Sequence, residues 1–532
     1  MLACKYISKL TIVLMSVVLV LCILAMAFHD KLSPIVTTAG YSMDYQDALF
    51  DPNKILEIDI VMDAAQWDEM LQNARKEEYY ECDIVINGAA FQQVGIRPKG
   101  NTSLSSIASD PDNDRYSFKL EFDQFLAGQT CFGLDKLILN NSYADPTNMK
   151  EAMIYDMFQY LDADASLYQY AKISVNGKYW GVYLALEAVE DSFMLRNYGT
   201  EKGYLYKPDG MNHNNGDQKF GDAFPAPQEN GFPDREEMEA MMQKRQTERK
   251  QEERMPFPNR EFGRGGPGNM GGGANLNYTD DVLDSYRSIW DGQVNDSSKA
   301  DHMRVLNALK NIHRKTDLER YIDVEQVLKY MAVHNFSVND DSLSGSMAHN
   351  YYLYESNEQI SILPWDYNLA FGGMHGGSSG TTVINAPIDE PWQSTKLFDF
   401  VLENEEYKTR YHEYYQKLAN GYFDSGRFEE TYQRIRKQID DLVKTDPNKM
   451  YTYEEYQRGA NVLYDAMMLR VESIQGQLNG TIPSTSEGQK ADASSLIDAS
   501  HIRISDLGQF MGGGPGGDRK LPGKWHQPAA NE

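Results

Sequence analysis

Acidic and amide side chains border a short predicted β-hairpin in the second half of the chain. Two apolar runs within residues 351–363 flank a polar break, which is the pattern of two strands joined by a turn. Asp340, Asp341 and Asn350 precede the hairpin, and Asp366 follows it. Because a hairpin brings its ends together, two carboxylates and an amide oxygen can converge on a hard cation such as Mg²⁺. The remaining carboxylate can orient an attacking hydroxyl, which completes the components of a phosphoryl-transfer site.

The same residues also have a structural interpretation. Asp and Asn side chains commonly cap helices and begin turns. Trp365 followed by Asp366 is equally typical of a buried tryptophan and a turn-capping carboxylate. Spacing alone leaves both interpretations open.

A polar loop at 97–103 offers a second place for negative charge. Gly100 lets the backbone approach a ligand closely, Arg97 and Lys99 supply positive charge, and Ser103 supplies a hydroxyl. These properties indicate a cradle for phosphates. An ordinary surface turn is the alternative.

Two charged residues lie on elements that the pattern predicts to be regular. Lys119 belongs to the polar face of an alternating strand at 116–122. Glu151 lies near the beginning of a helix predicted from 145 to about 161, where the helix dipole favours an acid. Taken singly, they are typical of a solvated strand face and a helix start.

Several segments, taken in order, resemble the spore-coat protein H (CotH) family of atypical protein kinases. They read GIRPKGNTS at 95–103, SFKLEF at 117–122, LILNNSYADPTNMKEAM at 137–153, VNGKYWGVYLALE at 175–187, GYLYKPDG at 203–210, NDDS at 339–342, HNYYLYE at 349–355 and ILPWDYNLAFGG at 362–373. The resemblance spans roughly residues 55 to 480 with one insertion. It implies a kinase-like fold, ATP, a divalent metal (Mg²⁺ or Mn²⁺) and phosphorylation of serine on protein substrates.

The resemblance gives roles to the residues around the hairpin. It implies that Asp366 and Asn350 bind the metal, and that Asp341, or alternatively Asp340, orients the substrate hydroxyl. The spacing from Asp341 to Asn350 is longer than in the usual kinase catalytic loop, and there is no His-Arg-Asp triplet. These departures concern the roles of single residues.

The resemblance also assigns residues to nucleotide binding. Lys119 is expected to pair with the phosphates of ATP, as the strand lysine of kinases does. Its partner is either Glu151 or Glu187, and Glu187 is alternatively expected near the adenine. The glycine signature of the family supplies four further residues: Arg97, Gly100, Asn101 and Ser103.

The chain is strongly acidic. Its formal net charge is −27, from 51 Lys and Arg against 78 Asp and Glu. Nucleic-acid binding needs a basic surface, so nucleic acid is excluded as a partner. A basic protein segment, such as a Ser-rich tail, is favoured electrostatically. Alternatively, the acidity only maintains solubility.

The N-terminus predicts a membrane segment. Residues 10–28 contain no charge and are long enough to span a bilayer, and Lys5 and Lys9 precede them. We therefore predict a single-pass signal anchor with the bulk of the chain extracytoplasmic. A cleaved signal peptide ending near 25–27, with a secreted or spore-associated product, is the alternative.

Two of the four cysteines follow this segment. Cys82 and Cys131 belong to no Cys-x-x-Cys pair or Cys/His cluster, so no zinc site is predicted. They form either a disulfide outside the cell or two buried free thiols.

These elements predict an α+β protein with an atypical protein-kinase-like bilobal fold behind the transmembrane helix. The predicted division is a cytoplasmic stub and anchor at 1–30, a linker at 31–54, a mixed β-rich N-lobe at 55–208, a disordered Gly/Pro/Glu-rich insertion at 209–278, a mainly helical C-lobe at 279–480 and a disordered tail at 481–532. Two other functions stay open: a pseudokinase or scaffold for coat or envelope assembly, and a nucleotidyl transferase on the same fold.

Overall fold

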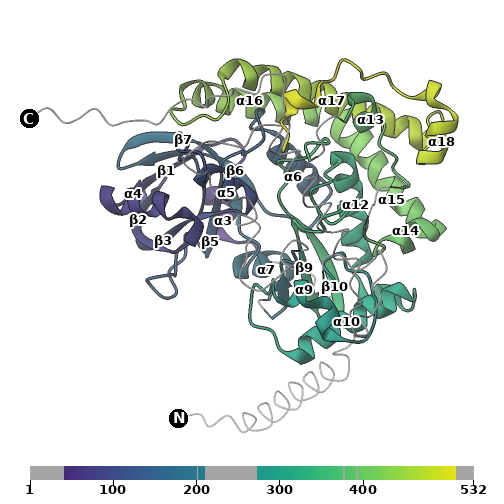
Figure 1. The fold of residues 1–532 in the computed structure, drawn as a ribbon, viewed down its shortest axis with the longest axis horizontal. Coiled ribbons are helices and arrows are strands. Elements are labelled where there is room, and N and C mark those ends of the chain that lie inside the picture. The colour runs from purple at the N-terminus through teal and green to yellow at the C-terminus, as the bar shows by residue number, and fades with distance from the viewer. Residues whose placement is uncertain (1–40, 201, 210–271, 375–377, 391–393, 511–532) are drawn as a thin grey trace, which may run out of the picture.

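The described residues form two structural parts, as Figure 1 shows. The computed structural model describes residues 41–200, 202–209, 272–374, 378–390 and 394–510. The N-terminal part is built around a closed β-sheet, and the C-terminal part is mainly helical with a small sheet of its own.

The closed sheet is a barrel of seven strands. These are β1 (Leu56–Val61), β2 (Tyr80–Ile86), β3 (Ala89–Lys99), β4 (Ser117–Glu121), β5 (Lys136–Asn140), β6 (Tyr168–Val175) and β7 (Lys178–Glu187). They follow the order β1-β2-β3-β4-β5-β7-β6, and parallel pairing between β1 and β6 closes the ring. Alternate side chains, such as Ile58 and Ile60 of β1 and Phe118 and Leu120 of β4, are buried, as a filled barrel requires.

The closed barrel corrects the predicted fold class. The prediction of an atypical protein-kinase-like bilobal fold is wrong, because the sheet assigned to the N-lobe closes on itself. Closure depends on the pairing of Leu56 with Ala171, which lie far apart in the chain. Hairpin patterns report only neighbouring strands, so they do not predict this contact.

The C-terminal part places helices around a three-stranded sheet in the order β10-β9-β8. Its strands are β8 (Tyr204–Tyr206), β9 (Tyr351–Ser356) and β10 (Gln359–Pro364). The α-helices within the described residues are α3 (Asp44–Leu49), α4 (Ala64–Gln72), α5 (Thr102–Ala108), α6 (Lys150–Tyr160), α7 (Asp191–Tyr198), α9 (Arg287–Trp290), α10 (Lys299–His313), α11 (Leu318–Tyr321), α12 (Val324–Ser337), α13 (Gly380–Ile384), α14 (Asp399–Glu403), α15 (Glu405–Lys417), α16 (Arg427–Thr445), α17 (Tyr453–Asn479) and α18 (Ser486–Ala491). Short 3₁₀ segments are Ala74–Lys76, Leu283–Tyr286, Ala493–Ser495 and Ile504–Leu507, and a π-helical turn spans Leu418–Phe423.

A buried ion pair joins the barrel to the end of α16. Arg115 Nη1 lies 2.7 Å from Asp446 Oδ2, and the two side chains are 3% and 2% exposed. The same carboxylate oxygen accepts a hydrogen bond from the Val182 N–H at 3.0 Å. A Cβ on Gly181 would lie 2.5 Å from Arg115 Nη1, so glycine leaves the space that the guanidinium occupies. This contact fixes the barrel against the helical part.

The segment 496–510, which we call the C-terminal strap, belongs to the tail predicted to be disordered. Its first residues contact α13, where the Ala499 N–H donates to Thr381 Oγ1 at 3.2 Å, and its turn Ile504–Leu507 packs against α17. Its side chains Ile502, Ile504 and Leu507 are buried. The Phe510 N–H donates to the carbonyl of Gly373 at 2.8 Å. Of the predicted insertion, residues 210–271 lie outside the described residues, as does the tail from 511.

The structure corrects the predicted single-pass membrane topology, and with it the transmembrane helix in the predicted fold class. In the described ranges, no helix combines the length and the apolar character needed to cross a bilayer. The segment 10–28, predicted to be the anchor, lies outside those ranges. Cys82 and Cys131 are both buried and free, so they do not form a disulfide.

Candidate functional site

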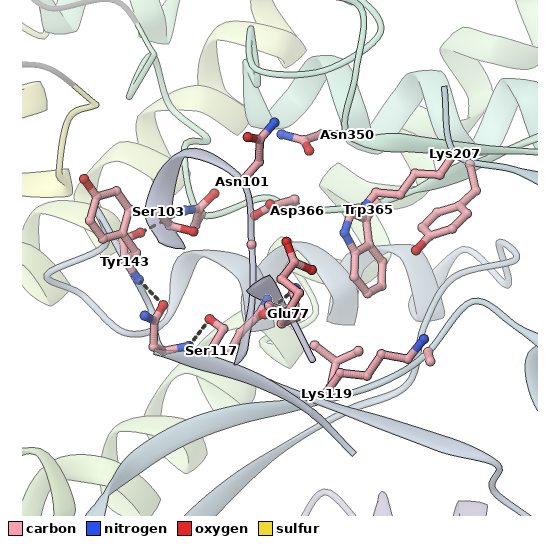
Figure 2. A pocket seen from close by; sticks show the side chains of 18 of the residues that line it. Glu77, Asn101, Ser103, Ser117, Lys119, Tyr143, Lys207, Asn350, Trp365 and Asp366 are labelled. Carbon is pink, nitrogen blue, oxygen red and sulfur yellow. Dashed lines mark hydrogen bonds between the residues drawn. The ribbon is translucent and has the colours of Figure 1, made fainter. Parts of the chain in front are cut away.

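A cavity of about 440 Å³ lies between the barrel and the helical part (Figure 2). Barrel strands contribute one wall, with Lys119 from β4, and the three-stranded sheet contributes the other, with Asn350 and Asp366 at the strand ends. Six predicted nucleotide or phosphate residues line it: Arg97, Gly100, Asn101, Ser103, Lys119 and Glu151. Both predicted metal ligands, Asn350 and Asp366, line it as well.

Lys99 is the lysine that faces the carboxylates. Its Nζ donates to Asn140 Oδ1 at 3.1 Å, and Asn140 Nδ2 donates to Glu151 Oε2 at 2.9 Å. The same Nζ lies 5.3 Å from the centroid of the Trp365 ring. Burial lowers the pKa of Lys99, although the charges of Asp366 and Glu151 act in the opposite direction.

Two of the carboxylates that line the cavity, Glu151 and Asp366, have raised pKa values. Burial, with the nearby charge of Asp366, raises the pKa of Glu151 to about 8. Burial also raises the pKa of Asp366, against the effect of Lys99. Because the two buried carboxylates lie near each other, each raises the pKa of the other, and a further positive charge would favour their ionised forms.

Lys119 and Glu187 do not form the predicted pair. Lys119 Nζ lies 2.5 Å from Glu190 Oε1, and Lys136 Nζ lies 2.7 Å from Glu190 Oε2. Glu187 is fully buried and is absent from the cavity lining, and it binds Arg196 Nη2 at 2.6 Å. Its Oε1 also accepts a hydrogen bond from Tyr45 at 2.5 Å. Glu187 therefore holds α3 and α7 against the end of β7.

The glycine loop at 97–103 closes one side of the cavity. Gly100 has a φ of +135°, and a Cβ there would lie 2.8 Å from Ser103 Oγ. Glycine is therefore required at this position. Arg97 is held by an ion pair with Glu77, which lines the same cavity.

The loop that carries Asp366 is held in a left-handed backbone conformation. Asp366 has a φ of +62° and Asn350 a φ of +54°. The Asn339 side chain donates to the carbonyl of Asp366 at 3.2 Å, and the Phe371 N–H donates to the carbonyl of Ser337 at 2.7 Å. Unfavourable backbone angles held by surrounding contacts are frequent at functional sites.

Asp341 lies behind Asn350 and is joined to it. Asn350 Nδ2 donates to Asp341 Oδ2 at 3.0 Å, and His349 Nε2 lies 2.9 Å from Asp341 Oδ1. Burial alone would lower the pKa of His349, but the hydrogen bond to Asp341 and its charge raise it. Neither Asp340 nor Asp341 is part of the cavity lining. Asp341 is connected to the cavity by its hydrogen bond with Asn350, which does line it.

A neutral histidine contacts both the loop that carries Asp341 and the loop that carries Asp366. His334, on α12, is 1% exposed, and burial lowers its pKa to about 3. Its Nε2 is within hydrogen-bond distance of Ser344 Oγ at 2.6 Å, and its Nδ1 of Tyr367 OH at 3.1 Å. Ser344 follows Asp341 closely in the chain and Tyr367 follows Asp366, so His334 fixes the spacing between the two loops.

The cavity lining is compatible with a divalent cation. Within the described residues, no group of three or more His, Cys, Asp or Glu could hold a metal ion by itself. Glu151 Oε1, however, is buried without a hydrogen-bond partner in the same cavity as Asp366. Asn350 and Asn368 donate through their Nδ2 atoms to protein oxygens, which leaves their amide oxygens for a cation. This set suits Mg²⁺ or Mn²⁺ when water and phosphate oxygens complete the coordination.

Sequence reasoning gave no role to Glu190 or Lys207, and it named Lys99 only as a positive charge of the predicted phosphate loop. Lys99 ends β3 directly before Gly100, yet the role of the phosphate lysine was predicted for Lys119. Glu190 lies just beyond the end of β7, and Lys207 lies within the segment GYLYKPDG. In the sequence, each of these residues is a charged side chain at or just beyond the end of a strand. Spacing alone does not distinguish such a residue from an ordinary surface charge.

Comparison with known proteins identifies the family. The sequence model of the family described as CotH kinase protein matches residues 96–259 and 269–474, which together cover well over half of the chain. The chain therefore belongs to this family, as the sequence predicted. Among individual proteins, the chain is similar to inner spore coat protein H of Bacillus subtilis (strain 168). The two are 21% identical over 371 residues, which are 69% of this chain and 84% of the relative.

Proposed function

We propose that the protein is an ATP-dependent kinase that phosphorylates serine or threonine side chains of proteins. The observation that carries the proposal is the meeting of Lys99, Glu151 and Asp366 in one cavity between the barrel and the helical part. A lysine beside carboxylates and amides is the set that positions and neutralises phosphates. The description of the family supports the same activity.

The nucleotide occupies the cavity along its length. Lys99 and the loop at 97–103 contact the phosphates, because they supply the positive charge and the polar groups of one wall. Ile138, Ala188 and Val294 line the apolar region that receives the base. A mostly preformed cavity with a few polar groups is the usual form of a nucleotide site.

Asp366 and Asn350 hold the divalent metal, with Glu151 and Asn368 beside them. When bound, Mg²⁺ or Mn²⁺ supplies positive charge that offsets the phosphates. Asn350 also keeps Asp341 in position through the hydrogen bond from its Nδ2. Asp341, bound to Asn350 and His349, orients the attacking hydroxyl toward the terminal phosphorus.

The substrates are protein segments rich in serine and basic residues. The net charge of −27 attracts such segments and disfavours nucleic acid. The relative is named as an inner spore coat protein. We therefore expect the substrates among spore-coat or envelope proteins.

Transfer of label from γ-labelled ATP tests the proposal. We expect the full chain to label a basic Ser-rich peptide, or itself, in Mg²⁺ or Mn²⁺. Asp366→Asn should abolish the label, and Asp68→Asn, on the exposed face of α4, should not. Wild-type protein that binds no nucleotide would contradict the proposal and favour a scaffold. Transfer from α-labelled ATP would instead indicate a nucleotidyl transferase.

A further inference from the structure

A second, smaller cavity adjoins the one described above. It has a volume of about 210 Å³ and shares four lining residues with the first: Asn101, Lys207, Gly292 and Asn350. His349, which is bound to Asp341, also lines the second cavity. The two cavities therefore meet beside the side chains assigned to phosphoryl transfer.

Lys207 stands at this junction and is fixed by its backbone. It directly follows β8, and its N–H donates to the carbonyl of Gly292 at 2.7 Å. A Cβ on Gly292 would lie 2.2 Å from the Lys207 carbonyl oxygen, so only glycine permits this approach. The position of Lys207 is thus set before any ligand binds.

Two aromatic rings hold the side chain of Lys207. Its Nζ lies 5.5 Å from the centroid of the Tyr352 ring and 5.4 Å from that of the Trp365 ring. Figure 2 shows the side chain alongside Trp365, on the wall that also carries Asp366. Cation–π contacts of this kind orient an ammonium group without neutralising it.

Among the described residues, no carboxylate forms an ion pair with the ammonium group of Lys207. Within the part of the chain that the structure describes, it has neither an ion pair nor a hydrogen bond, whereas Lys119 in the same cavity is paired with Glu190. Burial, with repulsion from Lys99, lowers the pKa of Lys207 to about 8, although the charges of Asp366 and Asp209 act in the opposite direction. An enclosed cation without a partner is unfavourable until an anion binds.

We propose that Lys207 binds the terminal phosphoryl group of the nucleotide where the two cavities meet, and that the second cavity receives the acceptor hydroxyl. This inference rests on the proposed function. During transfer the acceptor oxygen bonds to the γ-phosphorus, and the bond to the β–γ bridging oxygen breaks with its electron pair remaining on ADP. The hydroxyl proton passes to Asp341 by way of His349, which lines the second cavity and lies 2.9 Å from Asp341 Oδ1. Lys207 keeps its proton and donates hydrogen bonds to the oxygens of the moving group.

Titration calorimetry of the full chain with ATP, ADP and AMP in Mg²⁺ tests this role. Lys207→Met keeps an unbranched side chain over the rings and removes the charge. We expect the Kd for ATP to rise by about tenfold or more and that for AMP to stay within about twofold, because only ATP carries the contacted group. Lys207→Arg should recover most of the ATP affinity. Lys202→Met, at an exposed lysine just before β8, should match the wild type.

The melting temperature of the ligand-free protein is the second readout. Removing an unpaired cation should leave it unchanged or raise it, whereas loss of a purely structural lysine would lower it. Equal losses of ATP and AMP affinity in Lys207→Met, or an unchanged Kd for ATP, would overturn the inference. A wild-type protein that binds none of the three nucleotides would overturn the proposed function itself, and the role of Lys207 with it.

Discussion

Replacing Glu151 by glutamine should stabilise the ligand-free protein in a pH-dependent manner. The carboxyl has an ordinary pKa of 4.5, and burial with the charge of Asp366 raises its pKa to about 8 in the folded chain. At pH 7 the unfolded chain ionises Glu151, while the folded chain keeps it largely protonated. One pKa unit corresponds to about 1.4 kcal/mol, so the interval from 4.5 to pH 7 costs the folded state about 3 kcal/mol.

The sign of this effect follows from proton uptake on folding. Below pH 4.5 Glu151 is protonated in both states, so it contributes no penalty. As the pH rises toward 8 the folded chain binds more protons than the unfolded chain, and stability falls. Glu151→Gln removes the titrating group but keeps an acceptor for Asn140, which now donates to Glu151 Oε2 at 2.9 Å.

Urea unfolding at pH 4.5, 6 and 7, followed by tryptophan fluorescence, measures the difference. We expect Glu151→Gln to exceed the wild type by about 3 kcal/mol at pH 7 and to match it at pH 4.5. Glu69→Gln, at an exposed residue of α4, serves as the control. A difference that is the same at all three pH values would refute the assignment of a buried, protonated carboxyl.

Three further predictions concern contacts around the cavity. Arg115→Met should lower the free energy of unfolding by about 3–5 kcal/mol, because it leaves the Asp446 charge buried and unpaired; a loss below about 1 kcal/mol in urea would contradict this. Glu187→Gln should lower the melting temperature yet leave the calorimetric Kd for ATP unchanged, since this residue does not line the cavity; a weaker Kd would contradict its bracing role. Deleting the C-terminal strap and all that follows it should speed amide hydrogen exchange in α13, which the strap covers; unchanged exchange would show that the strap does not hold that helix.

The sequence correctly predicted contacts between residues that are close to one another in the chain. The hairpin pattern at 351–363 matches β9 and β10, and their ends place Asn350 and Asp366 in one cavity. Local alternation and a short turn are sufficient to specify such a pair of strands. The family resemblance ordered these segments but did not define their contacts.

Contacts between segments that are distant in the chain could not be predicted from the sequence. Lys99 and Lys119 lie on adjacent antiparallel strands, where Lys99 pairs with Ser117 and Arg97 with Lys119. Which lysine faces Glu151 depends on how α6 packs across the barrel, and the pattern within either strand does not encode that packing. Lys119 pairs with Glu190, which lies beyond the end of β7, whereas Glu187, the last residue of β7, binds Arg196.

The C-terminal strap shows a different limit. A polar segment beyond residue 481 indicated disorder, yet a few well-spaced apolar residues, Ile502, Ile504 and Leu507, are buried against the helical part. Average composition describes the whole segment, whereas packing depends on these single side chains. The strap also meets the turn after Asp366 through Phe510 and Gly373.

The most direct measurement is a crystal structure of the protein with a non-hydrolysable ATP analogue and Mn²⁺, located by its anomalous signal. We expect the nucleotide in the cavity between the barrel and the helical part, with manganese bound by Asp366 and Asn350 and the terminal phosphate beside Lys207. A nucleotide at another place, or manganese remote from Asp366, would contradict the assignment of this cavity as a phosphoryl-transfer site.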